Sequence, residues 1–125
     1  MQRNRQQKEH GMTHVLAAFR YSMSGLRMAL KETAVRHELI IVALHFSVMA
    51  VVGLSFERKF VLTLALSVIF ITELLNTAIE AVVDLASPGQ NSLAKKAKDL
   101  GSAAVFCALV LFFAGWGLTV LEAMR

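Results

Sequence analysis

Three acidic side chains and one asparagine recur at helical spacing in a stretch that is otherwise apolar. Residues 60 to 83 read FVLTLALSVIFITELLNTAIEAVV, and Asp84 follows directly. At about 100° per residue, Asn76 lies about 60° from Glu73 around a helix, and Glu80 and Asp84 lie about 20° to either side of it. The four side chains therefore form one polar stripe about 16 Å long on a single helix face.

This stripe has the residue types that phosphoryl transfer needs. A carboxylate at membrane depth costs about 2.5–3.5 kcal/mol on insertion scales, and such residues usually have a function. Clustered carboxylates repel one another unless a cation intervenes, and Mg²⁺ binds one or two carboxylates together with phosphate oxygens. A carboxylate that holds no metal can act as a general base toward a hydroxyl. Lys95, Lys96 and Lys98 follow the next connection and can contact phosphate.

Two other interpretations of the stripe remain open from the residues alone. A proton or cation pathway would also place acids inside the membrane, but residues 60 to 72 offer only Thr63, Ser67 and Thr72 to continue it. The stripe could also be a buried polar seam that joins helices in a scaffold without any catalytic activity. The chain has no GxxxxGK[ST], kinase glycine-rich loop, CxxC or HExxH motif.

Three apolar runs must position these residues. The chain has 125 residues, enough for one domain, and 56% of them are hydrophobic. The ranges 39–56, 60–72 and 100–121 contain no Asp, Glu, Lys or Arg. Because about 20 apolar residues span a bilayer, we predict an all-α membrane protein with spans at about 37–55, 59–84 and 99–121.

The segment before the first span has a different pattern. Apolar residues recur every three or four positions between residues 15 and 36, with Arg and Lys between them. This pattern predicts an amphipathic helix on the membrane surface. Residues 1–14 are polar, lack the apolar core of a signal peptide and are predicted to be a flexible tail. Residues 15–125 then form the membrane domain.

Lys and Arg predict the orientation of the spans. Seven precede the first span and three lie in the second connection, against Arg58, Lys59 and Arg125 on the opposite side. The positive-inside rule places the N-terminus and second connection in the cytoplasm and the C-terminus outside. The net charge of +4 follows from this topology, and no motif indicates nucleic-acid binding.

Smaller features complete the expectations. Pro88-Gly89 predicts a turn, and Ser92 can cap the helix that follows it. His45 is expected to form a hydrogen bond with a neighbouring helix rather than bind a ligand. Trp116 fits either an interfacial anchor or a packed side chain.

Two blocks carry a resemblance to a known family. Residues 73–84 read ELLNTAIEAVVD and residues 94–105 read AKKAKDLGSAAV. Together with Gly25-Leu26-Arg27, Glu32 and Arg36-His37-Glu38, they closely resemble the prokaryotic diacylglycerol kinases over about residues 15–121. The resemblance implies a homotrimer in the bacterial inner membrane, with active sites shared between subunits, that transfers the ATP γ-phosphate to a lipid hydroxyl.

The resemblance also implies residue roles. Glu73 is similar to the general base, Glu32 and Glu80 to the Mg²⁺ ligands, and Lys98 to the phosphate contact. The remaining residues implied to bind nucleotide, or to lie near the substrate, are Asn76, Asp99, Tyr21, Glu38, Asp84 and Ser102.

Some positions depart from the diacylglycerol-specific pattern. Gln90 and Asn91 stand where an aromatic residue and a histidine contact the nucleotide, and His14 replaces an arginine. Ser87-Pro88 resembles the undecaprenol kinases of the same family, whereas residues 101–104 resemble the diacylglycerol type. Diacylglycerol is therefore the expected substrate, with undecaprenol as the alternative.

Overall fold

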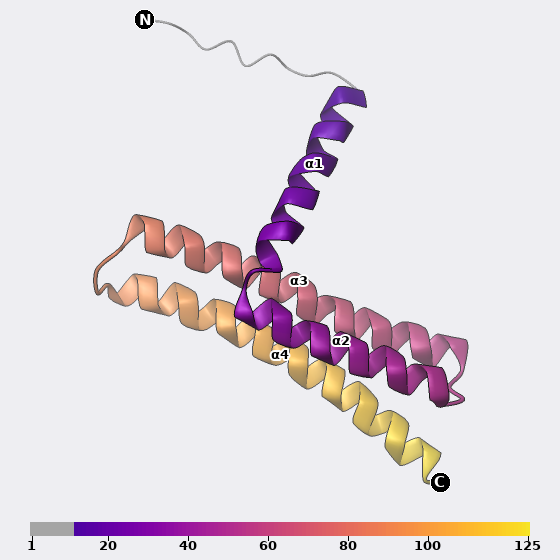
Figure 1. Ribbon diagram of the computed structural model, residues 1–125. Coiled ribbons are helices and arrows are strands. Elements are labelled where there is room, and N and C mark those ends of the chain that lie inside the picture. The colour runs from indigo at the N-terminus through magenta and orange to yellow at the C-terminus, as the bar shows by residue number, and fades with distance from the viewer. Residues whose placement is uncertain (1–11) are drawn as a thin grey trace, which may run out of the picture.

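The structure is a computed structural model, and it describes residues 12–125. These residues fold into four helices. They are α1 (Met12–Ala29), α2 (Thr33–Val51), α3 (Phe56–Ala86) and α4 (Ser92–Ala123), and these described residues contain no strand. Helices α2, α3 and α4 lie side by side, and α1 projects away from them crosswise (Figure 1). The predicted all-α membrane fold is confirmed. Residues 1–11 of the predicted tail lie outside the described part of the chain.

Three helices are long and apolar enough to cross a membrane. They are α2 with 19 residues, α3 with 31 and α4 with 32. At 1.5 Å per residue, α2 is about 28 Å long and α3 about 46 Å. The hydrocarbon core of a bilayer is about 30 Å thick, so α3 and α4 extend well beyond it.

The break between α1 and α2 falls earlier than residue 36, where the sequence pattern placed it. α1 ends at Ala29, and backbone hydrogen bonds from Lys31 N to Met28 O (3.0 Å) and from Glu32 N to Ala29 O (2.9 Å) tighten the turn. Residues 33–36 then form the first turn of α2. No glycine or proline marks this break, and the apolar spacing continues on both sides of it.

The core lies between α3 and α4, with α2 packed against both. Leu66 and Ile69 of α3 and Ala108 and Phe112 of α4 form the buried cluster. Ile41 and Val42 of α2 pack against it. The outward faces carry many exposed large apolar side chains, as expected of helices that contact lipid or another subunit.

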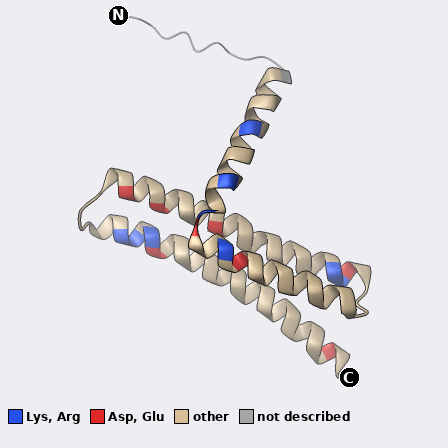
Figure 2. Cartoon of the chain, viewed as in Figure 1, with Lys and Arg blue, Asp and Glu red and all other residues tan. Residues whose placement is uncertain are grey.

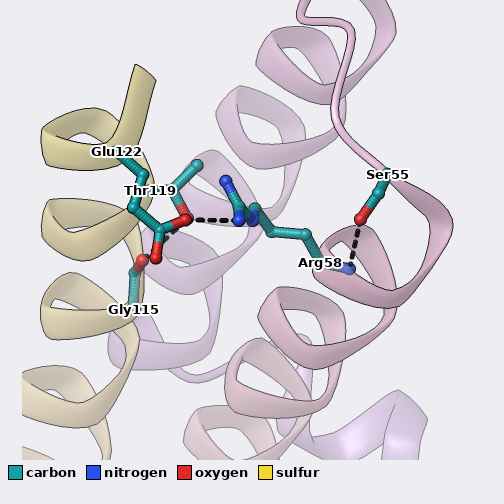
Figure 3. Close-up of polar contacts among 5 residues, drawn as sticks. All are labelled: Ser55, Arg58, Gly115, Thr119 and Glu122. Carbon is teal, nitrogen blue, oxygen red and sulfur yellow. Dashed lines mark hydrogen bonds and ion pairs between the residues drawn. The ribbon is translucent and has the colours of Figure 1, made fainter. Parts of the chain in front are cut away.

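An ion pair joins α3 to α4 at one end of the pair, and a side-chain cap begins α4 at the other end. At the end where α3 begins, Ser55 Oγ accepts a hydrogen bond from Arg58 N (3.4 Å), and the Arg58 side chain forms an ion pair with Glu122 (Figure 3). At the other end, Asn91 Oδ1 accepts hydrogen bonds from Leu93 N (2.8 Å) and Ala94 N (3.3 Å). The prediction that Ser92 caps α4 was therefore wrong by one residue. Asn91 is the cap, because its backbone is extended and its side-chain oxygen accepts hydrogen bonds from the free N–H groups at the start of α4.

Candidate active site

The polar stripe on α3 runs from the interior of the bundle to its surface. Glu73 and Asn76 are buried, with 6% and 7% of their surface exposed, Glu80 is half-buried, and Asp84 is exposed. Within the three long helices, charged residues lie at the ends of the α3–α4 pair and near the start of α2, and mostly uncharged stretches separate them (Figure 2). The buried end of the stripe thus places a carboxyl group where water is scarce.

Asn76 is held between α3 and α4. Its Nδ2 donates a hydrogen bond to Glu80 Oε1 at 3.3 Å, one helical turn along. Gly101 of α4 faces it so closely that a Cβ at Gly101 would collide with the Asn76 amide and approach Asn76 Cγ to 3.3 Å. The buried Oδ1 of Asn76 has no hydrogen-bond partner among the described residues. The glycine therefore makes room for an amide that is oriented but incompletely bonded.

A second buried carboxylate comes from α2. Glu38 is 8% exposed and interacts electrostatically with Glu73. Glu73 in turn interacts with Glu80. The Oε2 atom of Glu38 has no hydrogen-bond partner within residues 12–125. Three acidic groups therefore interact in a chain from α2 to α3, and a buried carboxylate without a partner is costly unless a proton or cation joins it.

Helix α4 brings positive charge to the exposed end of the stripe. Lys98 Nζ forms an ion pair with Asp84 Oδ1 at 2.7 Å and also interacts electrostatically with Glu80. Lys95 Nζ pairs with Asp99 Oδ2 at 2.6 Å one turn away. A pocket of about 260 Å³ opens here, lined by Val83, Asp84, Ser87, Gly89, Gln90, Asn91, Ala94, Lys95, Lys98 and Asp99. This pocket brings Lys95 and Lys98, two of the three lysines expected to contact phosphate, together with Gln90 and Asn91.

Some predicted site residues lie apart from this group. Tyr21 of α1 is 76% exposed, and Ser102 of α4 is also exposed. Glu32 is exposed in the turn between α1 and α2 and forms no hydrogen bond through its side chain in the described chain. The structure therefore places Glu73, Asn76 and Lys98 around Glu80. No side-chain hydrogen bond joins Glu32 to Glu80 in the described residues.

The donor set around Glu80 fits a hard cation in part. Glu80 supplies a carboxylate, whereas Asn76 faces Glu80 with its Nδ2 and has its buried Oδ1 against Gly101. Carboxylate oxygens suit Mg²⁺. Within residues 12–125, no group of three or more His, Cys, Asp and Glu side chains is arranged to hold a metal ion. The chain therefore offers part of a site, which further oxygens from phosphate, water or another subunit would complete.

Sequence reasoning did not identify Gly101 as part of this geometry. The run Gly101 to Ala104 consists of small residues, which suit close contact between helices but do not say which residue they face. Its position opposite Asn76 depends on how α4 is rotated against α3, which periodicity alone does not give. Trp116 was left open between two interpretations, and the structure shows it as a packed side chain that donates a hydrogen bond to His45.

Comparisons with known proteins show which family this chain resembles. The family model described as "Prokaryotic diacylglycerol kinase" matches residues 20–120. A diacylglycerol kinase of Sinorhizobium sp is 38% identical over 104 residues, which cover 83% of this chain and 76% of that protein. The Haemophilus influenzae diacylglycerol kinase is 38% identical over 114 residues, 88% of this chain and 94% of its own length. The Escherichia coli K12 diacylglycerol kinase is 36% identical over 107 residues, 85% and 88% of the two chains.

Proposed function

The chain belongs to the prokaryotic diacylglycerol kinase family, and from this premise we propose that it phosphorylates diacylglycerol to phosphatidic acid at the membrane surface. It is a membrane-embedded lipid kinase that uses ATP as phosphoryl donor. One observation of the chain itself carries the proposal. The polar stripe on α3 begins at the buried Glu73, continues through Asn76 and Glu80, and reaches Lys98 of α4 at its exposed end. A carboxylate at one end can accept the proton of the attacking lipid hydroxyl, and a cation at the other end can bind the phosphates of ATP.

The proposed reaction assigns one role to each group. Glu73 accepts the proton of the lipid hydroxyl as the hydroxyl oxygen bonds to the γ-phosphorus and the bond to the β-phosphate bridging oxygen breaks. ADP leaves with that oxygen. Lys98 contacts the phosphates as a point charge, and Asn76 orients Glu80 through its Nδ2. Asp84 and Asp99 hold Lys98 and Lys95 in place through their ion pairs.

We propose that Glu80 and Glu32 hold Mg²⁺ with the phosphates. When bound, this ion would neutralise charge that develops on the phosphate oxygens. The carboxylate of Glu80 provides oxygens of the right type, and Asn76 Nδ2 holds one of them by a hydrogen bond. Because Glu32 is exposed at the α1–α2 turn, it is free to approach a Glu80 of a neighbouring subunit. Gln90 of the α3–α4 connection and Tyr21 of α1 would then lie beside the nucleotide, with Ser102 and Glu38 near the lipid.

The assembly and its orientation belong to the same proposal. We propose a homotrimer in the bacterial inner membrane with active sites shared between subunits. The exposed apolar faces of α2, α3 and α4 are compatible with contacts between copies as well as with lipid. The distribution of Lys and Arg supports a cytoplasmic α3–α4 connection and an outer C-terminus. Residues 15–125 would act as one membrane domain, and we propose spans near 37–55, 59–84 and 99–121.

A single assay tests the substrate. Purified protein in mixed micelles would receive ATP labelled at the γ-phosphate, Mg²⁺ and one lipid alcohol at a time. We expect label in phosphatidic acid when diacylglycerol is present. Label in undecaprenyl phosphate alone would reassign the acceptor, and no labelled lipid with either alcohol would contradict a kinase and reopen the ion-pathway interpretation.

A substitution at Glu80 tests the metal site. We expect Glu80→Ala to weaken binding of Mg-ATP by roughly 10- to 100-fold, because the site would lose a carboxylate ligand and the hydrogen bond that orients Asn76. Titration calorimetry at fixed Mg²⁺ measures this loss, and Glu57→Ala, at an exposed position at the start of α3, is the matched control. Unchanged affinity for Mg-ATP in Glu80→Ala would remove Glu80 from the metal site.

A further inference from the structure

A buried histidine joins all three spanning helices away from the polar stripe. His45 of α2 is 3% exposed. Its Nδ1 accepts a hydrogen bond from Trp116 Nε1 of α4 at 3.3 Å, and its Nε2 lies 3.3 Å from Thr63 Oγ1 of α3. The rings of Phe46, Phe112 and Trp116 surround the imidazole. The expectation that His45 bonds a neighbouring helix is confirmed.

The partners assign the protonation state of His45. The indole nitrogen of Trp116 can only donate, so His45 Nδ1 must carry a lone pair. In neutral imidazole the other nitrogen then carries the proton, and His45 Nε2 donates to Thr63 Oγ1. The Thr63 hydroxyl in turn donates to Lys59 O at 2.8 Å. Every donor in this chain therefore has an acceptor. The charged side chains at the same end of the bundle are Glu57, Arg58 and Lys59 on α3, Glu122 on α4 and Arg125 after it.

This cluster is the polar connection of α2 to the rest of the bundle. In residues 12–125, the hydrogen bonds that join α2 to α3 or α4 all involve His45 or Thr63. The other faces of α2 expose large apolar side chains, including Leu39, Ile40 and Leu44. Any of these faces can contact lipid, because an apolar helix face has about the same free energy against lipid tails as against another apolar helix. Apolar burial alone therefore does not fix the rotation of α2.

Glu38 lies seven residues before His45 on α2. Seven residues are about two helical turns, so the two side chains share one face of the helix about 10 Å apart along its axis. Both are buried, and Glu38 interacts with Glu73. A rotation of α2 that broke the His45 bonds would also turn Glu38 away from Glu73.

We propose that His45 is a positioning residue whose bonds to Trp116 and Thr63 fix the rotation of α2 and so hold Glu38 beside Glu73. The inference rests on the proposed function, because it assigns the benefit of that rotation to the reaction at Glu73. His45 touches no reacting atom and acts through Glu38.

A set of variants tests this role. His45→Leu removes both bonds, Thr63→Val removes one acceptor with little change in shape, and His45→Gln retains one acceptor and one donor on a planar group. We expect His45→Leu to lower kcat about tenfold or more, because misplacing a site group by 1 Å can cost about 100-fold, while the KM for ATP stays within about twofold. Thr63→Val should show a smaller loss, and His45→Gln should recover most of the activity. Ser47→Ala is the control, since the Ser47 hydroxyl bonds only to Ala43 O of its own helix.

A double substitution separates positioning from general stability. If His45 acts through Glu38, His45→Leu should lower kcat no further in a Glu38→Gln background. A further loss of kcat in that background, or wild-type kcat in His45→Leu, would overturn the inference.

Trp116 is the single tryptophan of the chain, so its fluorescence emission reports on the His45 cluster independently of enzyme activity. His45→Leu should shift that emission and Ser47→Ala should not, and an unshifted spectrum would also overturn it. Lack of lipid phosphorylation by the wild-type protein would instead contradict the proposed function, and the emission test would still stand.

Discussion

Glu73→Gln should lower kcat for lipid phosphorylation by about 10²- to 10⁴-fold, which is the contribution typical of a general base. Glutamine keeps the size of the side chain and its hydrogen-bonding oxygen but cannot accept the proton of the lipid hydroxyl. Glu73 is buried against Glu38 of α2 and Glu80 of α3, and no cation among the described side chains is paired with it. The substitution removes one of these like charges, so we expect the folded oligomer to be retained.

Activity and assembly should be measured on the same preparation. Single-turnover assays in mixed micelles give the rate of the chemical step, and size-exclusion chromatography with light scattering gives the mass of the protein in the micelle. Glu57→Gln is the matched control, because it changes the same residue type at an exposed position of α3. Undiminished phosphorylation by Glu73→Gln would remove Glu73 as the base.

Gly101→Ala should damage both stability and turnover, because the added methyl group would collide with the Asn76 amide. Overpacking of this kind costs about 1–3 kcal/mol. If Asn76 swings aside to relieve the collision, it also releases Glu80, and a displacement of about 1 Å can lower turnover roughly 100-fold. Unfolding in denaturant-containing micelles and kcat in mixed micelles measure the two effects separately.

Three further variants isolate the cause of the Gly101→Ala effect. Gly117→Ala introduces the same methyl group on the same helix at a site where it would meet no atom of a neighbouring helix within 4 Å, so it controls for helix propensity. Asn76→Ala removes the amide that the methyl group would strike. The double variant Gly101→Ala/Asn76→Ala should be about as stable as Asn76→Ala but remain inactive. If Gly101→Ala behaved like Gly117→Ala in both assays, the close fit of Gly101 to Asn76 would have no consequence.

The sequence predicts the helices and the polar stripe of α3 well, because both follow from local patterns. Charge-free runs define the three spans, and a constant rotation per residue aligns Glu73 with Asn76, Glu80 and Asp84. The roles given to these residues remain predictions. The family resemblance, rather than the pattern, drew attention to Glu32 and Glu38.

Contacts between helices were less accessible from the sequence. Periodicity indicates which face of a helix is apolar, but α2 is apolar on most of its faces, so its rotation depends on His45, Thr63 and Trp116. The hydrogen-bonding role of His45 was predictable from its isolation in an apolar run, whereas its partners on α3 and α4 were not. The α1–α2 break and the Asn91 cap were misplaced because each depends on a few backbone torsions that side-chain spacing does not record.

The unequal lengths of the helices have a consequence for where the two substrates meet. α3 and α4 are longer than α2 by 12 and 13 residues, as their lengths of 31, 32 and 19 residues give. A two-helix stalk about 18 Å tall therefore continues past the third helix. On the proposed topology, this two-helix extension projects from the hydrocarbon core into the cytoplasm. Asp84 and Lys98 lie near its cytoplasmic end, and Glu73 lies where it leaves the membrane. ATP could then bind from the aqueous phase while the lipid alcohol stays in the bilayer, and the two would meet only at the membrane surface.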